Sequence, residues 1–118
     1  MTTNNDILDV FKTNIPTYTG KIIVRIDPVL KPYISEFLKS LDKDIARIVE
    51  YLNEKNFGEI RSIAHRLKGE GGTYGLDEAG KLGAKIQSAA VNENAAEIDR
   101  LVKQLSDYLK LIEIIDGN

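Results

Sequence analysis

From Asp27 to the end of the chain, apolar residues recur at intervals of three and four, and short polar stretches interrupt the pattern. This spacing is typical of amphipathic helices, because residues three and four apart share one face of a helix. The pattern predicts helices over about residues 28–52, 57–72, 77–92 and 95–115. Short connectors make sequential helices antiparallel, so the expected fold is all-α, an antiparallel four-helix bundle.

Polar residues mark where the predicted helices begin. The expected caps are Asp27 before Pro28, Asn56 with Glu59 three residues later, and Asp77. Residues 40–44 also include residues that can cap a helix. The first segment could therefore be two helices or one kinked helix, and we favour a single continuous helix.

A glycine-rich run over residues 69–75 is expected to end the second helix. Glycine costs about 1 kcal/mol in a helix interior, and Gly75 can adopt a left-handed turn. Two more glycines, Gly80 and Gly83, lie in the predicted third helix. They could permit close approach of the second and third helices, or they could simply weaken the third.

Residues 1–26 differ in character from the rest of the chain, which gives an expected division into an extension, 1–26, and a bundle, 27–118. The apolar residues of 7–11 could form a short helix, and residues 21–26 alternate partly and are rich in β-branched side chains. One strand alone cannot make a sheet. We therefore expect an extended segment or short helix that packs over an end or side of the bundle.

Composition excludes several classes of function. The 118 residues suffice for one domain, and the net charge of −2 offers no basic excess for nucleic acid. The chain has no cysteine and one histidine, so disulfides, thiolate metal sites and a cysteine nucleophile are excluded, and no metal site is expected. No apolar run reaches the roughly 18 residues of a membrane span, and the first residues do not resemble a signal peptide. A cytoplasmic location without membrane contact is expected.

The single histidine, His65, lies on the polar side of the predicted second helix. With residues placed at about 100° intervals, it points well away from the apolar face. The residues that share its side of the helix are two cations and two glycines: Arg61, Lys68, Gly69 and Gly72. His65 is therefore expected to project into solvent beside positive charge and uncovered backbone.

Such a face suits phosphoryl transfer. A neutral imidazole nitrogen is a nucleophile that can accept a phosphoryl group if another molecule brings its own active site close. Lys68 could neutralise charge on the phosphoryl group and disfavour the imidazolium. Arg61 could add to the positive field, while Gly69 and Gly72 would leave room for a docking partner.

The run His65-Arg66-Leu67-Lys68-Gly69, continued to Gly72 and Gly75, resembles the signature of histidine-containing phosphotransfer (HPt) domains of bacterial two-component phosphorelays. The resemblance covers about residues 28–115. It implies a four-helix bundle with an exposed histidine on its second helix. By the same resemblance His65 would be the phosphorylated residue, Lys68 its charge partner and Gly69 a clearance position.

The resemblance extends to Gln87 on the predicted third helix, where several family members place a glutamine near the histidine. It could orient the imidazole or contact the phosphoryl group. Family members usually have a small residue where this chain has Glu70, but Glu70 points away from His65 on the helical wheel. This departure bears on partner choice more than on chemistry.

The resemblance also implies a mechanism. HPt domains have no ATP site; they exchange phosphoryl groups with an aspartate of a response-regulator receiver domain, which supplies Mg²⁺. The chain would then be a phosphocarrier without a cofactor of its own rather than an enzyme, with a receiver domain or a hybrid histidine kinase as partner. A monomer is the simpler expectation, although relatives that pair through their helices keep a dimer possible.

Two other classes of function compete with the phosphocarrier. The first is an adaptor or anti-kinase regulator that binds a receiver or kinase without being phosphorylated. The second is an autonomous enzyme, for which residues are lacking. The segment Gly75 to Lys81 matches the start of a phosphate-binding loop, but Leu82 stands where Ser or Thr must follow.

Overall fold

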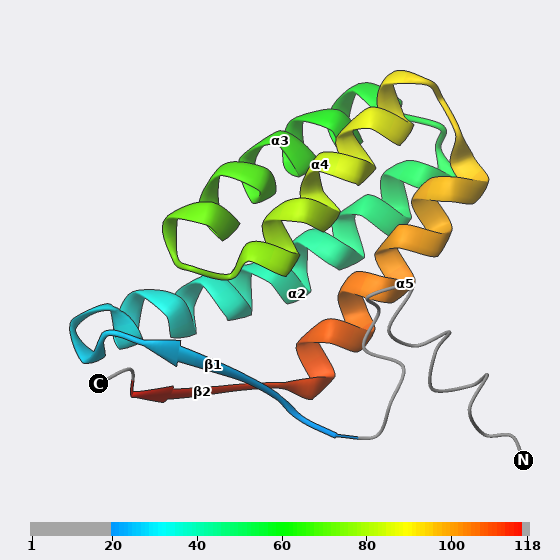
Figure 1. Cartoon of the computed structure of the whole chain (residues 1–118). Helices are drawn as coiled ribbons and strands as arrows, with labels where there is room; N and C mark the ends of the chain where they lie inside the picture. The colour runs from blue at the N-terminus through cyan, green and yellow to red at the C-terminus, as the bar shows by residue number, and fades with distance from the viewer. Residues whose placement is uncertain (1–19, 117–118) are drawn as a thin grey trace, which may run out of the picture.

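The structure is a computed structural model that describes residues 20–116 (Figure 1). Its elements in chain order are β1 (Ile22–Ile26), a 3₁₀ turn η1 (Pro28–Leu30), α2 (Lys31–Asn53), α3 (Phe57–Thr73), α4 (Asp77–Val91), α5 (Ala95–Leu111) and β2 (Ile112–Asp116). Figure 1 shows α2 to α5 running back and forth in one bundle, which confirms the predicted four-helix fold. No helix in residues 20–116 is long and apolar enough to cross a membrane.

The predicted helix starts are largely confirmed. The first segment is one continuous helix, α2, preceded by the η1 turn, and the Asp27 carboxylate accepts a hydrogen bond from the Val29 amide at 3.0 Å. The Asn56 side chain caps α3 by accepting from the Glu59 amide at 3.4 Å. Asp77, in contrast, makes no cap and lies inside the first turn of α4. The buried Leu76 takes the cap position, because the hydrophobic core fixes the chain there.

The glycine run ends α3 as the sequence predicted, within one residue of the expected position. The helix continues through Gly69 to Gly72 and stops at Thr73. Gly75 then adopts the expected left-handed conformation, with φ of 76°. The helix persists because Gly71 packs directly on α4: a Cβ atom at this position would lie 2.5 Å from the backbone nitrogen of Gly80. Packing against α4 thus offsets the poor helix propensity of glycine.

Glycines on both helices bring α3 and α4 unusually close together. A Cβ atom on Gly83 would lie 2.8 Å from the backbone nitrogen of Lys68, and one on Gly80 would lie 3.2 Å from the Lys68 carbonyl oxygen. Gly80 and Gly83 therefore permit close approach of the two helices. The distance between α3 and α4 is set by backbone contact, which side chains larger than glycine would prevent.

The ends of the described chain form a two-stranded parallel sheet that the sequence analysis did not foresee (Figure 1). The register pairs Ile22 with Ile112 and Ile26 with Asp116. The last helix, expected to reach about residue 115, ends at Leu111 because the β-branched run from Ile112 turns into extended backbone. This run is the partner strand that residues 21–26 lacked in the sequence analysis.

The inner face of the sheet packs on the bundle. Ile26 is buried in the hydrophobic core, and Ile22, Val24, Ile112 and Ile114 pack against it. Residues 22–26 of the predicted extension therefore contact the bundle as expected. The short helix predicted over residues 7–11 lies outside the described residues, and the division at residue 27 stays a prediction.

A buried ion pair connects α2 to α3. The Asp44 side chain is 4% exposed, and its Oδ1 atom accepts a hydrogen bond from Arg66 Nη2 at 2.7 Å. Its second oxygen, Oδ2, is buried without a hydrogen-bond partner among the described residues. The hydrogen bond to Asp44 is the main cause that raises the pKa of Arg66 above its usual range. Arg66 also contacts Glu70, at 3.1 Å.

Adjacent glycines in α3 should respond oppositely to the same substitution. Gly71→Ala forces a methyl group into the backbone of Gly80 and is expected to lower the free energy of unfolding by about 1–3 kcal/mol. Gly72→Ala meets nothing within 4 Å and should raise it by roughly 0.5–1 kcal/mol through helix propensity. Urea denaturation followed by circular dichroism measures both. Equal effects of the two substitutions would contradict the close contact between α3 and α4.

The buried ion pair makes a second stability prediction. Arg66→Met leaves the Asp44 carboxylate buried without a counter-ion and should cost about 3–5 kcal/mol. Combining it with Asp44→Leu should recover most of this loss, since no buried charge then remains. Glu70→Gln, which removes only the more exposed contact of Arg66, is the control and should cost under about 1 kcal/mol. Additive losses in the double variant would rule out the coupling.

Candidate functional site

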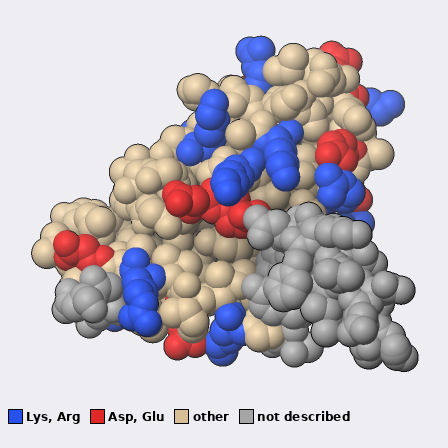
Figure 2. Space-filling view, in the orientation of Figure 1, with Lys and Arg blue, Asp and Glu red and all other residues tan. Residues whose placement is uncertain are grey.

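The sequence places His65 on the solvent side of α3. Its preceding neighbour Ala64 and the following Leu67 are fully buried in the core, whereas His65 itself is exposed. The apolar positions of α3 fix the rotation of the helix, and the histidine therefore points outward as predicted. Figure 2 shows Lys and Arg side chains across the helical part of the face that it draws, with Asp and Glu side chains between them.

Gln87 of α4 reaches the imidazole. Its amide nitrogen lies 3.2 Å from His65 Nδ1. The glycine contacts between α3 and α4 make this possible, because Gly83 and Gly80 on α4 lie four and seven residues before Gln87 and hold that face of α4 against α3. The other ring nitrogen, Nε2, has no hydrogen-bond partner within residues 20–116.

The hydrogen bond to Gln87 bears on the tautomer of the histidine. A neutral imidazole carries its proton on one nitrogen and a lone pair on the other. A side-chain amide can donate through its nitrogen to an unprotonated Nδ1 or, after rotation, accept through its oxygen from a protonated Nδ1. The second arrangement leaves the lone pair on Nε2, where it is available to an incoming electrophile.

The cations near His65 fall into two groups. Lys68 and Arg61 are exposed, and neither side chain has a hydrogen bond or ion pair to another residue in 20–116. Arg66, although adjacent to His65 in sequence, is occupied by Asp44 and Glu70. The Glu70 carboxylate is thus held by Arg66, in agreement with the predicted direction of Glu70. Lys68 and Arg61 are left to interact with an anion brought by a partner.

The glycines near His65 differ in their surroundings. A Cβ atom at Gly69 or Gly72 would meet nothing within 4 Å, so both positions face open space beside the histidine. Gly75 lies beyond the helix in the turn to α4. The structure therefore brings His65 and Gln87 together, with Lys68, Arg61, Gly69 and Gly72 on the exposed side of α3, and places Gly75 outside this group.

Two features of this region were missed in the sequence analysis. Val91, one turn after Gln87 on α4, is 59% exposed and adds an apolar side chain to this face of α4. The sequence could have indicated this, because Val91 follows Gln87 by four residues and residues four apart share one face of a helix. The second feature is Asp44, which stands at core spacing between Leu41 and Ile48 and could have been recognised as a buried charge that needs a partner.

The comparisons with known proteins identify the family. The sequence matches the family model described as Hpt domain over residues 32–113, which is more than half of the chain. The chain belongs to the Hpt domain family. Hpt domains are phosphocarrier modules of two-component signalling that transfer a phosphoryl group on histidine, and their partners are response regulators. No curated protein and no solved structure gives a significant match.

The contact between Gln87 and the imidazole makes a testable prediction. Gln87→Ala removes a hydrogen bond worth about 1 kcal/mol and should change the ratio of the two neutral His65 tautomers about fivefold. Two-bond ¹H–¹⁵N correlation spectra of the imidazole report this ratio. Gln104→Ala on α5 changes the only other glutamine in the chain and is the matched control. An unchanged ratio in the Gln87 variant would show that the amide does not select the tautomer.

Proposed function

We propose that His65 is the phosphorylated residue of this Hpt domain and that it exchanges its phosphoryl group with an aspartate of a response-regulator receiver domain. One observation supports this assignment above the others. The only histidine of the chain is exposed on α3, with Nδ1 held by Gln87 and Nε2 without a partner in residues 20–116. Membership of the Hpt family supplies the class of reaction.

The transfer step follows from the positions of the two ring nitrogens. The Nε2 lone pair of His65 attacks the phosphorus of the receiver's aspartyl phosphate, and a nitrogen–phosphorus bond forms. The bond between phosphorus and the aspartate oxygen breaks, and the carboxylate leaves with the bonding electrons. Throughout this step Nδ1 keeps its proton and donates a hydrogen bond to the carbonyl oxygen of Gln87, which requires the amide to rotate from the orientation in which its nitrogen faces Nδ1. The same steps in reverse return the phosphoryl group to an aspartate.

Lys68 and Arg61 have an electrostatic role in this proposal. Lys68 follows His65 by three residues on the same exposed side of α3, within one helical turn, and no described carboxylate neutralises it. Its ammonium group stabilises the negative charge of the phosphoryl oxygens as they approach Nε2. Arg61, one turn before His65, adds to the positive field that attracts an acidic receiver pocket.

The receiver domain supplies what this chain does not contribute. We assign the Mg²⁺ ion and the reacting aspartate to the partner, and the histidine, its orientation and the nearby cation to this chain. Gly69 and Gly72 leave the surface beside the imidazole uncovered, which allows the partner's aspartate to approach in line with Nε2. On this proposal the chain is a substrate and carrier, and the partner provides most of the catalysis.

A transfer assay tests the assignment. The purified chain is mixed with a radiolabelled phosphorylated receiver domain, and the expected label on the chain is labile to acid and stable to alkali, as phosphohistidine is. His65→Gln should accept no label because it removes the nucleophile. Lys68→Ala should slow transfer roughly tenfold or more through loss of a charge-assisted contact, whereas Lys103→Ala on α5 should not.

Two results would contradict the proposal. One is label that persists on the His65→Gln variant, which would place the phosphoryl group elsewhere. The other is a wild-type chain that binds a competent receiver and never acquires label, which would favour the adaptor alternative. Circular dichroism of each variant checks that the loss of label does not reflect unfolding.

A further inference from the structure

The two-stranded sheet lies mostly outside the part of the chain that matches the Hpt family. The match spans residues 32–113, which leaves out all of β1 and the last residues of β2. An isolated pair of strands is marginally stable in water and usually gains a third strand or a covering element. The sheet packs its inner face on the bundle, but within residues 20–116 no third strand pairs with it.

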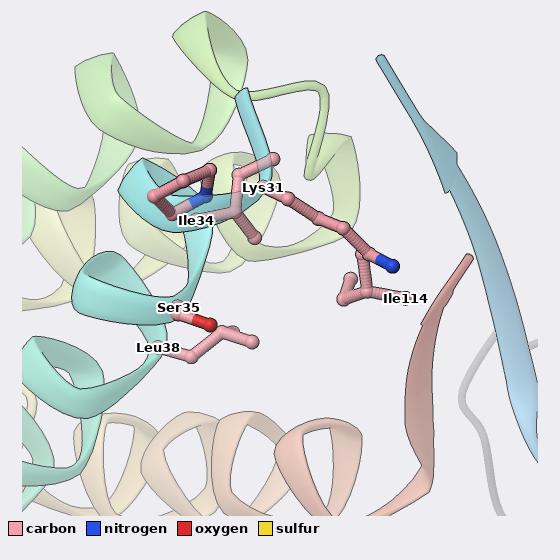
Figure 3. A pocket seen from close by; sticks show the side chains of 6 residues that line it. Lys31, Ile34, Ser35, Leu38 and Ile114 are labelled. Atoms are coloured by element: carbon pink, nitrogen blue, oxygen red, sulfur yellow. The ribbon is translucent and has the colours of Figure 1, made fainter. Parts of the chain in front are cut away.

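The sheet is covered on one side only. Ile22, Val24 and Ile26 alternate inward, while Lys21, Ile23 and Arg25 point outward and are exposed. Ile23 is 50% exposed, which is high for a large apolar side chain within a strand. A cavity of about 320 Å³ separates Ile114 of β2 from the first turns of α2 (Figure 3). Because the sheet has two strands within residues 20–116, each strand has one edge without a strand partner among these residues, and such an edge can pair with another strand.

The sequence of β1 restricts how a second copy of the strand could pair with it. In a symmetric antiparallel pair, one residue of the strand lies opposite its own counterpart, and the two-fold axis passes between these two residues. The inward-facing residues of both copies then lie on the same face of the combined sheet. An axis at Ile23 sets Lys21 opposite Arg25 of the second copy, and an axis at Arg25 sets that cation opposite itself. Like charges directly opposite each other destabilise a sheet.

An axis at Val24 avoids both conflicts. It sets Val24 opposite Val24 of the second copy and Ile22 opposite Ile26, so apolar residues meet on the inner face. Lys21 and Asp27 flank β1 on either side, and this axis sets each beside the other's counterpart in the second copy, which forms an opposite-charge pair at each end of the contact. The Lys21 side chain is 68% exposed and lies 3.8 Å from Glu113 of its own chain, so it stands between two carboxylates in this arrangement.

We infer that this chain forms a symmetric dimer in which the β1 strands of two copies pair antiparallel about Val24. The result is a four-stranded sheet with the order β2, β1, β1, β2. The edge of β2 is less suited to such pairing, because an axis at Glu113 places that carboxylate opposite itself and an axis at Ile114 gives no charge pair. The dimer is independent of the phosphoryl chemistry at His65, and it differs from the monomer expected from the sequence, which stays a prediction.

Cysteine cross-linking tests the register directly, because the 118 residues include no cysteine. Val24→Cys places two thiols opposite each other, where antiparallel Cα atoms are about 4.5–5.5 Å apart, and a disulfide spans about 4.4–6.8 Å. Mild oxidation should therefore yield a covalent dimer. Ile22→Cys is the matched control: its copies would be about four residues out of register, roughly 13 Å apart, and should not cross-link.

Charge reversal gives a second test, read by sedimentation equilibrium. Lys21→Glu should weaken dimerisation about tenfold by creating two like-charge pairs with Asp27. Asp27→Asn added to it should recover part of this loss, because the amide removes the repulsion and its oxygen can still accept from the Val29 amide. Glu113→Gln removes only the intrachain partner of Lys21 and should leave the dimer intact. Circular dichroism checks the fold of each variant.

Three outcomes would overturn the inference. A wild-type chain that stays monomeric at high concentration excludes the dimer. A dimer in which cysteine at position 24 does not cross-link, or cross-links no better than cysteine at position 22, excludes this register. Efficient cross-linking of Ile114→Cys instead would assign the interface to β2.

Discussion

The close backbone contact between α3 and α4 determines the geometry of the site. Gly71, Gly80 and Gly83 let the two helices approach until main-chain atoms touch, and a Cβ atom at Gly71 would come within 2.5 Å of the Gly80 backbone. This spacing brings Gln87 within 3.2 Å of the imidazole of His65. Helices separated by larger side chains would leave the histidine exposed but without a fixed orientation. Packing therefore holds the ring in a fixed orientation, which the proposed in-line attack requires.

Charge is divided between structure and function along α3. The Arg66 guanidinium forms ion pairs with the buried Asp44, which connects α2 to α3, and with Glu70. Lys68 and Arg61 have no such partner within residues 20–116 and keep their charge available at the surface. A cation held in an ion pair stabilises the fold, whereas a solvated cation beside His65 can respond to an incoming phosphoryl group. Arg66 and Lys68, two residues apart in sequence, thus have different roles because they lie on opposite sides of the helix.

The sequence was sufficient for the bundle and for the direction of His65, because both depend on helical periodicity. It placed the end of α3 within one residue, although the contact with α4 that keeps the glycine run helical could be read only from the structure. The sheet was missed because β1 and β2 lie about 90 residues apart, at opposite ends of the described chain, and pairing across that separation has no local signal. The contact between Gln87 and His65 was predicted only through family resemblance. Which atoms of the two side chains meet could be seen only in the structure.

The most direct test of the account is the identity of the nitrogen that carries phosphorus. Phosphorus–nitrogen couplings in the ¹⁵N-labelled, phosphorylated protein distinguish the two ring positions of His65. Because Gln87 occupies Nδ1, the account predicts phosphorus on Nε2, with Nδ1 protonated and donating to the Gln87 amide oxygen once the amide has rotated. Phosphorus on Nδ1, or on a residue other than His65, would contradict it.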